Sequence, residues 1–279
     1  MLIANPIYDT VFKYLMENLD IAKGVISTII GEEIDHLDFK AQENIFKVES
    51  YWFSYHLDFI ARIRQAGGGG YKDVLIELQK TNTPLDLMRF RRYLGDQYRR
   101  EEGVILKDGA SSKEILPIVT IYFLGFYLSH TLPGVIKVNR QYIDALSGGT
   151  IDERNEFIEC LTHDSYVIQI PGLQLDMKNR LEYVLSIFKQ ENFIREDHHL
   201  KDYSYQVDDE LIRKILKQLE KAAADSELLH QLDLEEMAVR EYEKAIGPFE
   251  AKLQAKEKLL EEKDKYIQEL LKKLETQGK

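Results

Sequence analysis

The sequence has very little cysteine and no long apolar run, and each absence excludes a class of protein. Its 279 residues include a single cysteine, Cys160, which cannot form a disulfide within the chain. No group of Cys and His residues has the spacing of a zinc site. The apolar-rich run ILPIVTIYFLGFYL is shorter than the roughly 20 residues that span a bilayer. The N-terminal segment lacks the basic and apolar regions of a secretory signal. We therefore expect a cytoplasmic protein.

Positive charge is scarce overall but concentrated in one segment. The chain has 37 Lys and Arg against 48 Asp and Glu, a formal net charge of −11. This balance argues against a protein that coats nucleic acid through its overall charge. The segment RFRRYLGDQYRR nevertheless holds five arginines against one acid, Asp96, and acidic runs such as DDE and DLEE lie in the C-terminal third. The overall charge therefore does not exclude a local basic surface that binds nucleic acid.

The first 145 residues alternate between helical and strand patterns. Residues 5–31 have apolar side chains at helical spacing, with Gly31 as a stop. Residues 50–65 alternate with period two, and after the glycine-rich AGGGG the chain returns in the apolar segment 73–81, which together predict a hairpin. We expect a helix from about Pro84 to Glu101. The following ILPIVTIYFLGFYLS is typical of a strand buried on both faces. This order predicts an α/β core with a mixed sheet.

Two further regions follow the predicted core, which we assign to residues 1–145. Residues 146–246 are expected to be mainly helical, with one short strand at VIQIPGLQ, and residues 247–279 form a charged helical tail. In the tail an apolar residue recurs every seven positions, but the partner positions of a coiled-coil seam are mostly charged. The pattern therefore allows two interpretations: these C-terminal helices form a homo-oligomer, or the tail is surrounded by solvent. The recurring residues are Leu253, Leu260, Ile267 and Leu274.

An acidic residue, Glu77, lies inside the predicted strand DVLIELQKT. A buried carboxylate is costly unless it is paired, hydrogen-bonded or bound to a cation. Antiparallel pairing of the two strands can bring Asp58 beside Glu77 on one face. Carboxylates on rigid strands are the oxygen ligands that Mg²⁺ prefers, and the backbone carbonyl of Leu78 could add a third oxygen at the strand edge. Alternatively, both acids could simply face solvent on an exposed sheet face.

A longer ordered pattern surrounds the two acids. Its features are Asp58 before a glycine-rich turn, Glu77 and Gln79 in IELQK, Arg89 followed four residues on by Tyr93, the strand LPIVTIYFL, and Asp9, Phe12 and Lys13 in YDTVFKYLM. Over about residues 5–130 this pattern resembles the PD-(D/E)XK nuclease superfamily, and more closely its transposase-type branch of recombination-promoting nucleases. The resemblance implies an α-β-α sandwich with a mixed, restriction-endonuclease-like sheet that hydrolyses DNA phosphodiester bonds with Mg²⁺ or Mn²⁺.

The resemblance also implies a role for individual residues. Asp58, Glu77 and Gln79 would be catalytic, and Asp58 and Glu77 would bind the metal together with the carbonyl of Leu78. Asp9 could reach the metal directly or through a water molecule. The remaining residues, expected to contact nucleic acid, are Lys13, Arg89, Arg92 and Tyr93.

The sequence departs from the family motif at Gln79, where a lysine is expected. A lysine can stabilise developing negative charge as a cation. Glutamine can orient a water molecule by hydrogen bonds, but it has no charge and is not a base at neutral pH. Two functions therefore agree with the sequence. One is a metal-dependent endonuclease, and the other is a catalytically weak or inactive nuclease-like module that binds nucleic acid or protein.

Overall fold

The computed structural model describes most of the chain between its first residue and residue 244. In parts of the strands and helices, including most of the predicted site, only the backbone is described. The chain divides into two compact units, Met1–Asp233 and Leu234–Lys279, so the predicted boundary near residue 145 falls inside the first unit. The predicted tail, 247–279, lies outside the described residues. These are 1–39, 54–64, 71–81, 87–99, 102–105, 111–194, 198–237, 240–241 and 244.

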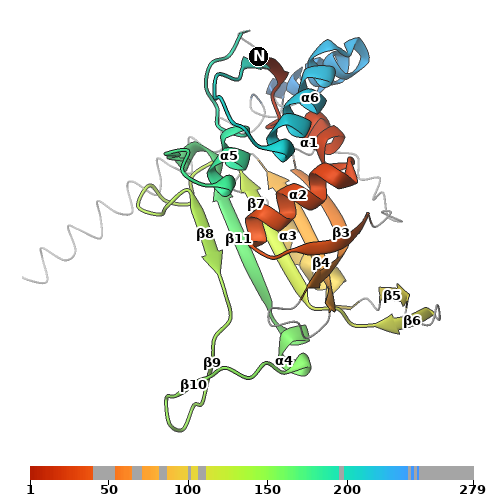
Figure 1. Ribbon diagram of the computed structural model, residues 1–279, viewed down its shortest axis with the longest axis vertical. Coiled ribbons are helices and arrows are strands. Elements are labelled where there is room, and N and C mark those ends of the chain that lie inside the picture. The colour runs from red at the N-terminus through yellow and green to blue at the C-terminus, as the bar shows by residue number, and fades with distance from the viewer. Residues whose placement is uncertain are drawn as a thin grey trace, which may run out of the picture. The chain divides into compact units, whose positions relative to one another are not determined.

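A six-stranded mixed sheet forms the centre of the first unit (Figure 1). Its strand order is β2-β3-β4-β7-β11-β8. Strands β4, β7 and β11 run parallel, whereas β2 pairs antiparallel with β3, β3 with β4, and β8 with β11. The predicted mixed α/β class is therefore confirmed. The strands are β2 (Ile34–Phe39), β3 (Ser54–Arg64), β4 (Tyr71–Thr81), β7 (Ile118–Leu124), β8 (Val135–Val138) and β11 (His163–Gln169).

The predicted hairpin is confirmed by the pairing of β3 with β4. The register runs without interruption from Ser54 opposite Thr81 to Arg64 opposite Tyr71. Its cause is the period-two alternation of the sequence, which puts buried residues such as Phe59 on one face. The glycine-rich connection, 65–70, lies outside the described residues.

The two predicted N-terminal helices are α1 (Asp9–Met16) and α2 (Leu19–Ile30). The side chain of Asn18 accepts a hydrogen bond from the backbone N–H of Ile21 and so caps the start of α2. Helix α2 ends at Gly31, whose φ of 73° is left-handed. The predicted stop is confirmed, because this backbone conformation favours glycine.

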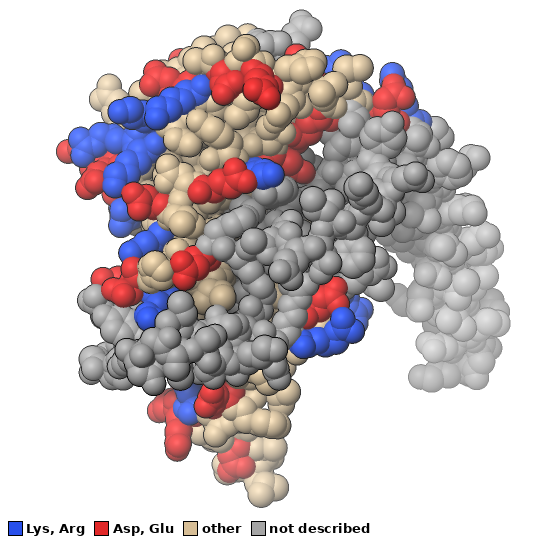
Figure 2. Space-filling model, turned by 90° about the vertical axis from the view of Figure 1, so that its right-hand side faces the viewer, with Lys and Arg blue, Asp and Glu red and all other residues tan. Residues whose placement is uncertain are grey.

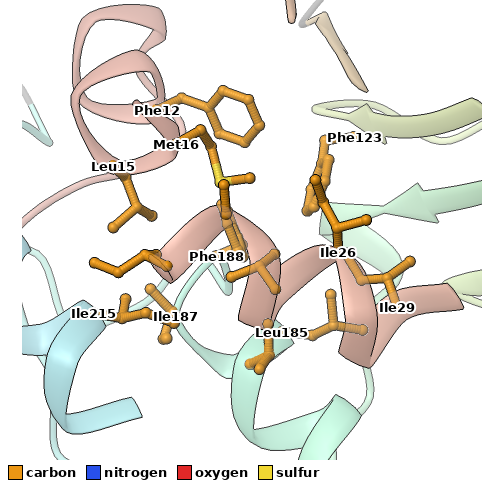
Figure 3. Close-up of a cluster of buried hydrophobic side chains, with 14 of the residues drawn as sticks. Phe12, Leu15, Met16, Ile26, Ile29, Phe123, Leu185, Ile187, Phe188 and Ile215 are labelled. Carbon is orange, nitrogen blue, oxygen red and sulfur yellow. The ribbon is translucent and has the colours of Figure 1, made fainter. Parts of the chain in front are cut away.

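The main hydrophobic core lies between these helices and one face of the sheet (Figure 3). Phe123 of β7 has its ring centroid 5.5 Å from that of Phe12 on α1 and 4.9 Å from that of Phe188. Leu185 of α5 (Arg180–Ser186) and Ile215 of α6 (Glu210–Ala224) belong to the same cluster. Both helices were expected from the sequence, although α5 is shorter than its apolar pattern.

Helix α3 (Leu87–Gln97) contacts the opposite face of the sheet. The ring of Phe90 lies 5.2 Å from that of Tyr122 on β7. Nearer the other end of the helix, Leu94 and Tyr98 pack against Leu116 and Ile118. The predicted helix after the hairpin is thus confirmed over a shorter span, and residues 82–86 lie outside the described part of the chain.

Between β8 and β11 the chain leaves the sheet in an extended excursion, residues 139–162, which we call the arm (Figure 1). The arm was not expected from the sequence. Arg140 fixes its base, with Nε 3.0 Å from Oδ1 of Asp164 and a guanidinium nitrogen 2.8 Å from Oε2 of Glu159. The arm contains β9 (Tyr142–Ile143), β10 (Thr150–Ile151) and α4 (Glu156–Leu161).

The smaller elements lie outside the central sheet. Strand β1 (Leu2–Ala4) pairs with β12 (Leu200–Asp202), and β5 (Glu102–Ile105) pairs with β6 (Ser111–Glu114). A short 3₁₀ helix, η2 (Ile170–Gly172), follows β11. None of these pairs was expected, because strands of three or four residues leave too short an alternation to detect.

Candidate active site

Asp58 and Glu77 are direct partners in the register of β3 and β4. In an antiparallel pair, directly opposed residues have Cβ atoms about 4.5–5.5 Å apart and share one face. The predicted juxtaposition of the two acids is therefore confirmed at the level of backbone pairing. Their side chains lie outside the described part of the chain, so metal ligation stays a prediction.

The pairing extends beyond the two acids across two further strands. Glu77 is paired with Thr120 on β7, and Thr120 is paired with Ser165 on β11. Asp58, Glu77, Thr120 and Ser165 thus form a continuous row over four adjacent strands, which we call the polar row. Because paired residues in a sheet share a face, the row crosses one face of the sheet from β3 to β11.

The hydroxyl end of the polar row is fully described. Thr120 is completely buried, and its Oγ1 donates a hydrogen bond of 2.8 Å to Oγ of Ser165. Beside the row, Ile118 is buried in a small apolar cluster with Leu94 and Ile60. Thr120 is therefore buried where a polar group is costly without a hydrogen-bond partner, whereas its partner Ser165 is half-buried.

Helix α3 crosses the polar row. Phe90 contacts Tyr122, two residues beyond Thr120 on β7, whereas Leu94 packs against Ile118, two residues before it. The backbone between Phe90 and Leu94 must pass over the position of Thr120. The predicted nucleic-acid-binding residues of this helix, Arg89, Arg92 and Tyr93, lie in or beside this segment, although their side chains are outside the described part.

Gln79 lies two residues beyond Glu77 on β4 and so falls on the same face. It is paired with His56 of β3 and with Tyr122 of β7. Phe90 of α3 contacts Tyr122. Gln79, where a lysine was expected, therefore belongs to a cross-strand row that α3 contacts. The backbone thus places Gln79 next to the polar row, on the side of Phe90.

Two of the predicted residues belong to α1, on the core side of the sheet. Asp9 is the first residue of this helix, and its Oδ1 is buried. Lys13 is half-exposed, with Nζ 3.7 Å from Oε1 of Glu17. Phe12 packs on the face that carries Phe123, opposite the face of Thr120. The strand pairing does not bring Asp9 or Lys13 into the polar row, and their roles stay predictions.

Leu78 differs from the sequence expectation in its position within the sheet. Its carbonyl was predicted to bind the metal on the assumption of a strand edge. Strand β4 is instead an interior strand, and Leu78 is paired with Leu57 on one side and with Ile121 on the other. Backbone groups of an interior strand belong to the hydrogen-bond ladder, so we leave this carbonyl out of the proposal below.

A second polar contact lies on the same face, where β11 begins. The hydroxyl oxygen of Tyr98 is 2.7 Å from Nδ1 of His163. Burial, assisted by the nearby charge of Arg140, lowers the pKa of His163, and burial raises the pKa of Tyr98. Both shifts favour the neutral forms, so the pair is a neutral hydrogen bond near pH 7.

The described surface has no broad field of one charge on the face shown in Figure 2, where Lys and Arg side chains alternate with Asp and Glu. Among the side chains that are described, no three His, Cys, Asp or Glu residues come together as a metal site. The side chains of Asp58 and Glu77 are not among those described. In the same part of the chain no helix is long and apolar enough to cross a membrane.

Sequence reasoning missed Thr120 and Ser165. One signal was present, because Thr120 is the only serine or threonine in the apolar segment ILPIVTIYFL. Its relation to Glu77 depends on the register of two parallel strands separated by a helix, and period-two patterns do not fix that register. Scans against protein-family models, curated proteins and solved structures found no match to this chain.

Proposed function

We propose that this chain is a divalent-metal-dependent nuclease that hydrolyses DNA phosphodiester bonds. The observation that carries the proposal is the direct pairing of Asp58 with Glu77 in the centre of a mixed sheet. Two adjacent ionised carboxylates repel each other, and a bound cation removes that repulsion. Mg²⁺ or Mn²⁺ fits this donor set, because both prefer oxygen ligands.

The arrangement of helices supports the nuclease-like α-β-α sandwich that belongs to this proposal. Helix α1 packs through Phe12 on one face of β7, and α3 packs through Phe90 on the other. The order helix, hairpin, helix and parallel strand also agrees with the resemblance of residues 5–130 to the PD-(D/E)XK superfamily. A role in recombination or in a mobile element rests on that resemblance alone.

The residues of the chain would divide the work as follows. Asp58 and Glu77 would hold the ion, which polarises the scissile phosphate and lowers the pKa of a bound water. Gln79, on the same face, would orient the attacking water by a hydrogen bond but cannot remove its proton. Arg89 and Arg92 would bind phosphate groups, contacts that supply affinity without reading sequence.

The experiment that tests the proposal is plasmid nicking with Mg²⁺ or Mn²⁺. Wild-type protein is expected to cut, and Asp58→Ala and Glu77→Ala should each lower the rate more than about a hundredfold, since each removes a metal ligand. Asp38→Ala is the matched control, because Asp38 is an exposed carboxylate on the neighbouring strand β2. Equal cutting by wild type and both site variants would rule out these residues as the catalytic centre.

The second candidate function is a nuclease-like module that binds nucleic acid without cutting it. The uncharged Gln79 at the lysine position favours this candidate. Gln79→Lys separates the two functions, because it adds the cation that the motif expects. If wild type binds DNA and metal without cutting, and Gln79→Lys begins to cut, the natural chain is a binding module built on a nuclease site.

A further inference from the structure

The hydroxyl end of the polar row has a hydrogen-bonding direction. Thr120 is fully buried and donates its hydroxyl hydrogen to Ser165. A hydroxyl group has one hydrogen and two lone pairs. With that hydrogen directed to β11, Thr120 offers only lone pairs toward its other neighbour in the row, Glu77 on β4.

The neighbour on that side is also an acceptor. An ionised carboxylate accepts hydrogen bonds and donates none. The pairing of Glu77 with Thr120 across β4 and β7 thus puts two acceptors at neighbouring positions of one face. A donor between them satisfies both, because buried polar groups without partners are costly. Because Ser165 accepts the hydroxyl hydrogen of Thr120, a group between Thr120 and Glu77 must be a hydrogen-bond donor.

A water molecule in the shell of a bound cation is such a donor. Mg²⁺ held by one or two carboxylates keeps several waters, whose hydrogens point away from the ion. Groups that accept those hydrogens orient the ligands and strengthen metal binding. We propose that Thr120 is a positioning residue, whose hydroxyl is oriented by Ser165 so that it accepts a hydrogen bond from a water of the metal's hydration shell. This inference rests on the proposed function and deepens it.

Thr120 differs in this role from a half-buried threonine whose hydroxyl bonds only within its own helix. Thr28 on α2 also donates its hydroxyl hydrogen, to the carbonyl of Gly24 at 2.7 Å, but it lies within a helix and outside the polar row. The two residues provide a matched pair, since Thr→Val at either position removes one hydroxyl hydrogen bond and keeps a β-branched side chain. Only the change at Thr120 is expected to affect the metal.

Calorimetric titration of the full chain with Mn²⁺ alone tests the inference without depending on cleavage. Thr120→Val is expected to weaken Mn²⁺ binding about 10- to 100-fold, the range found for residues that support metal ligands. Thr120→Ser, which keeps the hydroxyl, should stay within about threefold of wild type. Thr28→Val should bind as wild type does, and Asp58→Ala and Glu77→Ala should lose binding.

The possible results separate the two proposals. If Asp58→Ala and Glu77→Ala lose Mn²⁺ while Thr120→Val keeps wild-type affinity, the role of Thr120 is wrong and the metal site stands. If the wild type itself binds no Mn²⁺, the proposed function fails, and the role of Thr120 fails with it. Should Thr120→Val not fold, Ser165→Ala replaces it, because it removes the acceptor that orients Thr120. Wild-type affinity in a folded Ser165→Ala variant would then overturn the inference.

Discussion

The two faces of strand β7 differ in what their side chains contact. On one face Phe123 contacts Phe12 and Phe188 in the main core. On the other face Thr120 is just as buried but lies in a row of polar residues beneath α3. The first face is explained by packing alone, since apolar groups gain free energy on burial. The second face carries the residues that we propose to bind a metal ion, and the predictions below test this contrast.

Phe123→Ala is expected to have the largest effect on stability. The substitution removes a fully buried ring from the core and should lower the free energy of unfolding by about 3–5 kcal/mol. Thr120→Val, at an equally buried position of the same strand, should cost about 1 kcal/mol, the value of one hydrogen bond. Urea denaturation measures both. Equal losses would contradict the contrast between the faces.

Much of this contrast could be predicted from the sequence. The alternation in β3 and the isolated Glu77 in β4 were sufficient to predict the hairpin and the pairing of two acids. The register of β7 and β11 was not, because parallel strands are connected by long crossovers that leave register to tertiary packing. Strand β2 was also missed, since its buried residues, Ile34 and Leu37, are separated by polar ones.

A buried polar group also occurs outside the polar row, and its hydrogen bonds are made within the chain. Lys201 of β12 is 2% exposed, and its Nζ donates to the carbonyls of Ile187, at 2.7 Å, and Lys189, at 2.5 Å. These carbonyls follow the end of α5, where a cation is favourable. Lys201 thus shows what a buried polar residue with a structural role looks like in this protein, with every acceptor supplied by backbone.

The pH dependence of stability should reveal Lys201. Burial lowers its pKa to about 8, from 10.5 for the unfolded chain. Between these values the unfolded chain holds the proton more tightly, so stability should rise with pH from 8 to 10.5, by roughly 3 kcal/mol at most. Urea denaturation across this range should show the rise in wild type and in Lys214→Met, an exposed control. Its persistence in Lys201→Met would show that another group causes it.

Two consecutive residues at the start of β11 repeat the contrast between the faces. By strand alternation, Asp164 lies on the core side and His163 on the side of α3. Asp164 is bound by Arg140, which is 13% exposed. Burial alone would raise the pKa of Asp164, but the hydrogen bonds from Arg140 outweigh it, and the pKa is lowered. The core side thus has an ion pair, and the other side has a neutral contact.

Arg140→Gln is expected to lower the free energy of unfolding by about 1–3 kcal/mol at pH 7, because it leaves Asp164 and Glu159 without their shared cation. Since the folded pKa of Asp164 is lowered, its contribution is present above about pH 4 and is lost as the pH falls through the folded value. The variant should therefore lose less stability in acid than wild type does. Arg154→Gln, at a largely exposed position, is the control and should cost about 0.5 kcal/mol.

Tyr98→Phe should have the smallest effect of the series. It removes the hydroxyl that lies 2.7 Å from Nδ1 of His163 and leaves the ring that packs on Ile118. One neutral hydrogen bond is worth about 1 kcal/mol when its partner is partly buried. Tyr127→Phe is the matched control, since the hydroxyl of Tyr127 makes one hydrogen bond, which it donates to the carbonyl of Pro171 at an exposed site. A loss for Tyr98→Phe no larger than that of the control would show that the hydroxyl contact with His163 does not help to hold α3 on this face, and that the apolar contacts of Phe90 and Leu94 do so instead.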